Sequence, residues 1–176
     1  KNSKWAIEVM KNPEQIQSFQ LDSLNTEYAE YANVWLDKHY QLYYSSFSQP
    51  YKGDSSRHVL QLMTAQTRPE GRVDYRLSPL NVPDHHTAYI CFNEDHSAVY
   101  YAVGDYNKDK QIFFELYRRK QLSDGVWGEP EKLPDYINLR KSSTSQPSIG
   151  KLPGETAETL FFVSDRPGGK GKKVWR

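Results

Sequence analysis

The sequence predicts an all-β protein, on three observations. Short runs rich in Tyr, Phe, Val, Ile and Leu alternate with clusters of Gly, Pro, Asn and Asp. Turn signals recur about every 8–12 residues, which is typical of all-β chains. Helical periodicity is confined to Trp5–Met10, and Pro13 ends it. The clearest predicted strands are Tyr40–Ser46, His58–Thr64, Ala98–Val103, Ile112–Tyr117 and Thr159–Ser164.

Length and composition exclude several classes of protein. The chain has 176 residues, about the size of one domain. Its 23 basic and 22 acidic residues nearly cancel in charge. The chain as a whole therefore has no positive electrostatic field that would attract nucleic acid or an anionic membrane. The mean hydropathy is −0.83, so no transmembrane segment is expected. Lys1–Met10 lacks the apolar region of a secretory signal. One cysteine, Cys91, excludes an internal disulfide and a cysteine-built zinc site.

An apolar–Asn–x unit marks three repeats. Asn81 follows Asn25 by 56 residues, and Asn138 follows Asn81 by 57. An apolar residue, a polar turn and an aromatic strand then follow each asparagine in the same order. The apolar residues are Trp35, Phe92 and Ile149, and the strands are Leu42–Ser45, Val99–Ala102 and Leu160–Ser164.

Each repeat is about 57 residues long and contains only predicted strands. This predicts one four-stranded antiparallel sheet per repeat, which is the blade of a β-propeller. In the second repeat the strands are expected at Ala88–Phe92, Ala98–Val103, Gln111–Arg119 and Trp127–Leu133. The adjacent aromatic residues of each second strand indicate burial on both faces, as when blades stack.

The domain organisation follows from this spacing. Residues 1–15 are expected to form a short helical lead-in or the tail of an upstream domain, and residues 16–176 the propeller repeats. Within these, 25–80 and 81–137 are blades, and 138–176 is an incomplete blade. Because propellers have about four to eight blades, three repeats predict a partial propeller and a longer protein. The alternative is a three-bladed ring that residues 16–24 close as an outer strand.

Two segments carry a family resemblance. The third repeat contains Ser164-Asp165-Arg166-Pro167-Gly168-Gly169, and the second ends in Trp127-Gly128-Glu129-Pro130-Glu131-Lys132-Leu133. With Asp95 before the strand of Val99–Ala102, these segments resemble the TolB-type, WD40-like β-propeller repeat over Ile16–Arg176. They are similar to propellers found beside OmpA-like peptidoglycan-binding domains in the Bacteroidetes cell envelope, including PorE-type components of the type IX secretion system. The first repeat departs from the family, with Leu36-Asp37-Lys38-His39 at the expected Pro-Asp-Gly turn.

The resemblance implies a non-catalytic interaction scaffold of the periplasm, associated with the outer membrane. It implies a peptidoglycan-associated or type IX secretion or gliding complex, and partners among other envelope or secretion proteins. Peptidoglycan would be bound only through domains absent from this chain. The alternative is the accessory propeller of a serine peptidase or other hydrolase. The chain contains no Gly-x-Ser-x-Gly, Walker or His-Glu-x-x-His motif, and we expect it not to be an enzyme.

Two sets of side chains suggest a metal, and for both we favour a structural explanation. Asp105-x-Asn107-x-Asp109 has calcium-loop spacing, but Lys110 and Leu116 stand where the loop needs Gly and Glu. A solvated hairpin loop is therefore expected. His39, His85, His86 and His96 match no known metal spacing and are expected in surface loops. We expect neither a metal nor a cofactor.

The remaining candidates concern contacts. Loop Ser48–Arg57, with Tyr51 and Arg57, is a possible partner-contact loop, as is Gly104–Lys110; a plain connecting loop is the alternative. The basic run Arg166–Arg176 is expected to be a solvated hairpin loop, or else to touch an anionic partner. Cys91 is expected to be a small buried hydrophobe. Trp35 and Trp127 lie on different predicted strands, which argues against a lectin with one tryptophan per blade.

Overall fold

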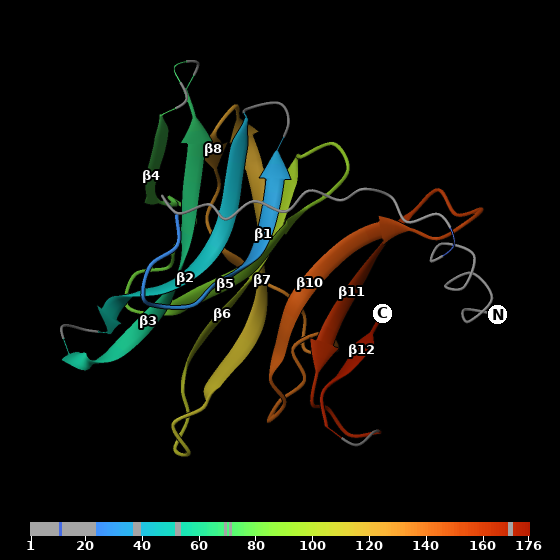
Figure 1. Ribbon diagram of the computed structural model, residues 1–176. Helices are drawn as coiled ribbons and strands as arrows, with labels where there is room; N and C mark the ends of the chain where they lie inside the picture. The colour runs from blue at the N-terminus through green and yellow to red at the C-terminus, as the bar shows by residue number, and fades with distance from the viewer. Residues whose placement is uncertain are drawn as a thin grey trace.

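A computed structural model describes Lys11 and residues 24–36, 40–51, 54–68, 70, 72–168 and 171–176. Twelve strands of this part of the chain form three antiparallel sheets (Figure 1), which confirms the all-β prediction. Within the described residues, no helix has the length and apolar character to span a membrane. The predicted helix Trp5–Met10 and the predicted closing strand up to residue 23 lie outside the described residues.

Each sheet is a meander in which neighbouring strands follow one another along the chain. The first sheet contains β1 (Glu30–Leu36), β2 (Gln41–Tyr51), β3 (Asp54–Thr67) and β4 (Val73–Leu77). The second contains β5 (His86–Phe92), β6 (Ala98–Tyr106) and β7 (Ile112–Ser123), with the short strands β8 (Val126–Trp127) and β9 (Glu131–Lys132) both paired to β7. The third contains β10 (Thr144–Lys151), β11 (Glu158–Ser164) and β12 (Lys173–Trp175).

Several boundaries differ from the sequence prediction. The expected outer strand Trp127–Leu133 is divided into β8 and β9, because Pro130 between them has no N–H for a ladder bond. The expected loop Gly104–Lys110 starts later, since β6 runs to Tyr106. The expected loop Ser48–Arg57 is mostly a hairpin, with β2 reaching Tyr51 and β3 starting at Asp54. In both hairpins the backbone hydrogen bonds between the two strands continue beyond the apolar residues from which the strands were predicted.

The same β-bulge occurs in the first strand of every sheet. Ala32, Tyr89 and Gln146, each 57 residues after the last, have φ angles of 54°, 57° and 52°. At each of them the pairing with the second strand shifts by one residue. A positive φ is unfavourable for a side chain with a Cβ, so three copies of it mark one shared backbone geometry. The repeat read from the sequence is therefore a structural repeat.

Two of the three repeat asparagines make the same pair of hydrogen bonds to the backbone of one leucine. We call this pair of bonds the asparagine clamp. The Asn81 amide accepts the N–H of Leu62 at 2.9 Å and donates to the carbonyl of the same residue at 2.9 Å. Asn138 makes both bonds to Leu116, at 2.7 and 2.9 Å. Each amide thus holds the third strand of the preceding sheet. Asn25 stands at the corresponding place before β1 and is exposed.

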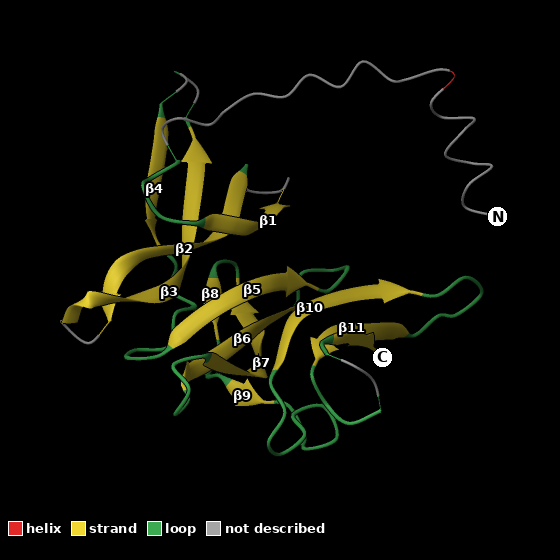
Figure 2. Ribbon diagram, turned by 60° about the horizontal axis from the view of Figure 1, so that its bottom comes forward, coloured by secondary structure: helices red, strands yellow, loops and turns green. Residues whose placement is uncertain are grey.

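The sheets pack against one another over apolar side chains, and the first strand of the second and third sheets, β5 or β10, contacts the sheet before it. In Figure 2 the first sheet lies above the second, and the third sheet lies beside the second. Tyr101 and Leu80 are completely buried in one cluster, and Phe162 and Leu116 in another. The predicted burial of the second strands holds for β6, and for residues 43–46 of β2. β11 is only partly buried.

The Asn138 clamp yields a stability prediction. Asn138→Ala leaves the buried N–H and carbonyl of Leu116 without the amide, so we expect a loss of about 2–3 kcal/mol in the free energy of unfolding by urea. Asn33→Ala is the matched control, because Asn33 is exposed on β1. It should change stability by less than about 0.5 kcal/mol. Equal effects of the two variants would contradict the clamp.

Candidate binding cleft

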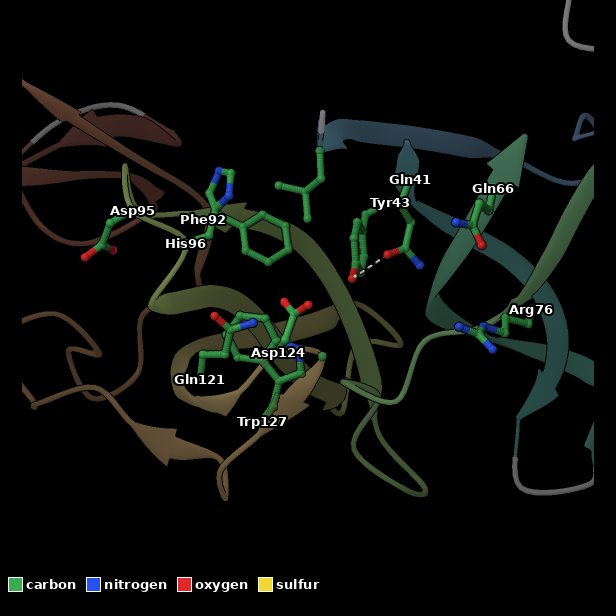
Figure 3. A pocket seen from close by; sticks show the side chains of 12 residues that line it. Gln41, Tyr43, Gln66, Arg76, Phe92, Asp95, His96, Gln121, Asp124 and Trp127 are labelled. Atoms are coloured by element: carbon green, nitrogen blue, oxygen red, sulfur yellow. Dashed lines mark hydrogen bonds between the residues drawn. The ribbon is translucent and has the colours of Figure 1, made fainter. Parts of the chain in front are cut away.

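A cleft opens where the first and second sheets meet. Its volume is about 300 Å³, and its walls come from both sheets (Figure 3). The first sheet contributes Leu36, Gln41, Tyr43, Gln66 and Arg76, and the second contributes Phe92, Asp95, His96, Gln121, Asp124, Gly125 and Trp127. We call this site the seam cleft. It lies at the ends of β1 and β5 and beside the turn from β7 to β8.

Three aromatic rings form the apolar part of the seam cleft. The ring centroids of Tyr43 and Phe92 lie 5.2 Å apart in an edge-on arrangement, and those of Phe92 and Trp127 lie 5.9 Å apart. Edge-on and tilted pairs at these distances are favourable. Because Tyr43 belongs to the first sheet and the other two rings to the second, these contacts also hold the two sheets together.

Polar groups surround the rings. The Tyr43 hydroxyl donates to Oε1 of Gln41 at 3.2 Å. Burial raises the pKa of Tyr43, and the positive charge of Arg76 partly opposes this shift. The hydroxyl therefore stays protonated at neutral pH and can donate. Arg76 is exposed, and no carboxylate of the described residues forms an ion pair with its guanidinium. The arrangement suits a ligand that combines an apolar group with a carboxylate or another acceptor.

The turn between β5 and β6 fixes one wall of the cleft. Asp95 accepts hydrogen bonds from the N–H and hydroxyl of Ser97 at 2.9 and 2.6 Å, and from the amide of Asn93 at 2.7 Å. Those from Ser97 are the main reason that the pKa of Asp95 lies below its usual range. His96 lies in this turn, as predicted of a loop histidine, and its φ of 59° is a conformation that Gly adopts most readily.

The predicted contact loop lies away from this cleft. Gln41 is the first residue of β2 and lines the cleft, whereas Tyr51 is the last residue of the same strand. The backbones of Tyr51 and Arg57 belong to the hairpin of β2 and β3, and their side chains lie outside the described part of the chain. Their role as partner contacts stays a prediction.

The calcium-like motif is a hairpin loop, as the sequence analysis favoured. Asn107 Oδ1 accepts the N–H groups of Asp109 and Gln111, both at 2.9 Å, and thereby closes the turn from β6 to β7. Asp105 lies at the end of β6, and its Oδ2 is 2.7 Å from Nδ1 of His85. No group of three or more His, Cys, Asp or Glu in the described ranges is arranged to hold a metal ion.

The prediction that the histidines lie in surface loops is wrong for His86. This residue is completely buried at the start of β5, where its Nδ1 accepts the N–H of Leu60 at 2.9 Å. Its ring contacts Tyr106 edge-on at 4.7 Å. Ser143, 57 residues later, accepts the N–H of Phe114 at 3.0 Å in the same way. His86 therefore joins two sheets. His39 lies outside the described residues.

Arg166 also departs from the sequence prediction, which placed it in a solvated basic loop. Its guanidinium donates to the carbonyls of Tyr136 and Ile137, the first at 3.0 Å. It lies 4.6 Å from the ring centroid of Phe162 and 5.3 Å from that of Trp175. Burial lowers the pKa of Arg166. This arginine connects the third sheet to the loop before it, whereas Lys172 and Lys173 are exposed as expected.

Sequence reasoning found only part of the seam cleft. Phe92 and Trp127 lie on predicted strands, and Trp35 and Trp127 do lie on different strands. Gln41, Arg76 and Gln121 were missed, since they stand on separate strands with no motif around them. A search for polar residues at the strand ends bordering predicted turns would have found Gln41. Comparison with protein-family models, curated proteins and solved structures finds no match to this chain.

Cys91 yields a prediction about reactivity. It lies on β5 and is half-buried, not fully buried as predicted, and desolvation still raises the pKa of its thiol to about 12. Because the thiolate is the reactive form, we expect the native chain at pH 8 to react with a disulfide reagent at least about a hundredfold more slowly than the urea-unfolded chain. The absorbance of the released thiolate measures both rates. Similar rates, with a native circular dichroism spectrum, would contradict the burial of Cys91.

Proposed function

We propose that the chain is a non-catalytic interaction module built from β-propeller blades, and that the seam cleft binds its partner. The single observation that carries the proposal is this cleft, formed where two repeated sheets meet and lined by aromatic rings beside the exposed guanidinium of Arg76. Aromatic and arginine side chains dominate the energetics of many protein interfaces. The repeated bulges and the two asparagine clamps support the assignment of the sheets as blades.

The chemistry of the cleft narrows the partner. Tyr43, Phe92 and Trp127 offer an apolar surface, and Arg76 offers a charge that can bind a carboxylate in bidentate fashion. Gln41 and Gln121 add amide groups that can bond to a peptide backbone. We therefore propose a partner segment that presents an aromatic or aliphatic side chain next to an acidic residue.

The proposed location is the periplasm, in association with the outer membrane of a Bacteroidetes bacterium. This part rests on the resemblance of Ser164–Gly169 and Trp127–Leu133 to envelope propellers. The proposed partners are other envelope or secretion proteins, in a peptidoglycan-associated or type IX secretion complex. Peptidoglycan itself would be bound through domains other than the sheets described above.

A capture experiment tests the cleft. The protein is immobilised, incubated with detergent-solubilised envelope proteins of a Bacteroidetes bacterium, and the bound proteins are quantified by mass spectrometry. We expect Arg76→Glu to lower capture of the specific partners by about tenfold, since the charge that binds the carboxylate is reversed. Tyr136→Ala is the matched control, because Tyr136 is 74% exposed and outside the cleft.

A second arm of the same experiment uses Tyr51→Ala combined with Arg57→Ala. If this variant loses the partners and Arg76→Glu keeps them, the contact lies on the hairpin of β2 and β3, and the cleft proposal is wrong. If neither variant changes capture, both surfaces are excluded as contacts. Circular dichroism of each variant verifies that the fold is intact.

Cell fractionation tests the location. The intact protein, expressed at its native level in the host, is expected in the envelope fraction and released with the periplasm or the outer membrane. A cytosolic enzyme and an outer-membrane protein serve as markers. Recovery with the cytosolic marker would overturn the envelope assignment but leave the cleft proposal untouched.

A further inference from the structure

A buried histidine joins the second sheet to the first. His86, at the start of β5, has 0% exposure, and its Nδ1 accepts the N–H of Leu60 on β3 at 2.9 Å. We call this hydrogen bond the His86 joint. An imidazole nitrogen accepts a hydrogen bond only when it carries no proton. The His86 joint therefore requires the neutral ring, with its one proton on Nε2.

The equivalent bond between the second and third sheets uses a group that gains no proton. Ser143 stands 57 residues after His86, and its hydroxyl accepts the N–H of Phe114 on β7 at 3.0 Å. Leu60 and Phe114 are equivalent positions, because each lies two residues before a leucine that an asparagine clamp holds. Ser143 is also buried. Of these two bonds, the His86 joint is the one that a proton can break.

Aromatic rings from two strands pack on the imidazole. The ring of Phe47 on β2 is stacked with it at 6.0 Å between centroids, and the ring of Tyr106 on β6 meets it edge-on at 4.7 Å. The Tyr106 hydroxyl donates to the carbonyl of His58 on β3 at 3.1 Å, which is a second contact between the two sheets. A positive charge on His86 would be buried among these rings and removed from water, which disfavours the protonated form.

The titratable side chains described around His86 come from β3, from β6 and from the loop before β5. From β3, His58 packs on Phe47 at 6.4 Å between ring centroids, and it is itself a base. From β6, Tyr106 presents its ring. In the loop, His85 is bound through Nδ1 to Asp105 of β6 at 2.7 Å, and these two side chains are 41% and 44% exposed. The charge of Asp105 is therefore directed to His85 and to water.

We propose that the His86 joint makes the contact between the first and second sheets sensitive to acid. A proton from solvent binds Nδ1 of His86, Leu60 loses its acceptor, and β5 separates locally from β3, while the bond of Ser143 holds. A solvated histidine has a pKa of about 6.5, so the open form takes up this proton as the pH falls through that value. The stabilisation by the joint is complete above that pH and is lost progressively below it.

This inference goes beyond the proposed function, and it holds whatever the seam cleft binds. Hydrogen exchange of the full, isotope-labelled chain, followed by NMR, tests it. The measured quantity is the protection of single amides, corrected for the intrinsic effect of pH on exchange. Because opening takes up one proton, we expect the protection of the Leu60 N–H to fall about tenfold between pH 6 and pH 5. The protection of the Phe114 N–H should not follow it.

Two variants identify the group that takes up the proton. His86→Asn keeps an acceptor, since its amide oxygen can take the place of Nδ1, and it does not titrate. In this variant the protection of Leu60 should not depend on pH. His58→Asn is the matched control: it removes the neighbouring histidine and should keep the tenfold change. If His86→Asn does not fold, the comparison of Leu60 with Phe114 in the wild type and in His58→Asn still decides.

Three results overturn the proposal. The first is a wild-type Leu60 whose protection stays constant between the two pH values. The second is a fall in protection that persists in His86→Asn or disappears in His58→Asn, because another group then takes up the proton. The third is an equal fall at Leu60 and Phe114, since the chain would then unfold as a whole instead of opening between the first and second sheets.

Discussion

The structure depends on the hydrogen-bonding capacity of buried backbone where an outer strand ends. Beyond that end, the third strand of a sheet still presents an N–H and a carbonyl, and both are costly to bury without partners. A carboxamide carries an acceptor oxygen and a donor NH2 side by side, so one side chain can bond to both the N–H and the carbonyl of one residue. Asn81 and Asn138 use it to satisfy both groups of Leu62 and Leu116. The connection between sheets is thereby held to the sheet that it leaves.

The other contacts between sheets follow from this arrangement. Leu80, next to Asn81, is placed between the first two sheets, where it is completely buried with Leu62 and Tyr101. The following strand then starts at His86, which bonds to Leu60, two residues from the clamped leucine. Asn81 and His86 thus both connect the start of the second sheet to β3. The repeated bulge adds a fixed bend in the first strand of every sheet.

The seam cleft lies beyond the end of this packing. Where β1 and β5 end and turns follow, the residues between the sheets are no longer only apolar and include glutamines, Arg76 and Asp124. The seam cleft draws its rings from the packed interior and its polar groups from the ends of strands and from turns. The turns can differ between repeats without disturbing the clamps, since the clamps lie on the connections between sheets.

The sequence by itself determined the strand content, the 57-residue period, the buried second strands of the first two sheets and the equivalence of Asn81 with Asn138. These features depend on local patterns that recur along the chain, so one sequence is enough to detect them. Only the tertiary structure decided the burial of His86, the contacts of Arg166 and the assembly of the seam cleft. Their neighbours come from other sheets, and side-chain type alone does not reveal such partners. Asn25 illustrates the same limit: the pattern makes it equivalent to Asn81 and Asn138, and only the packing shows that it is exposed.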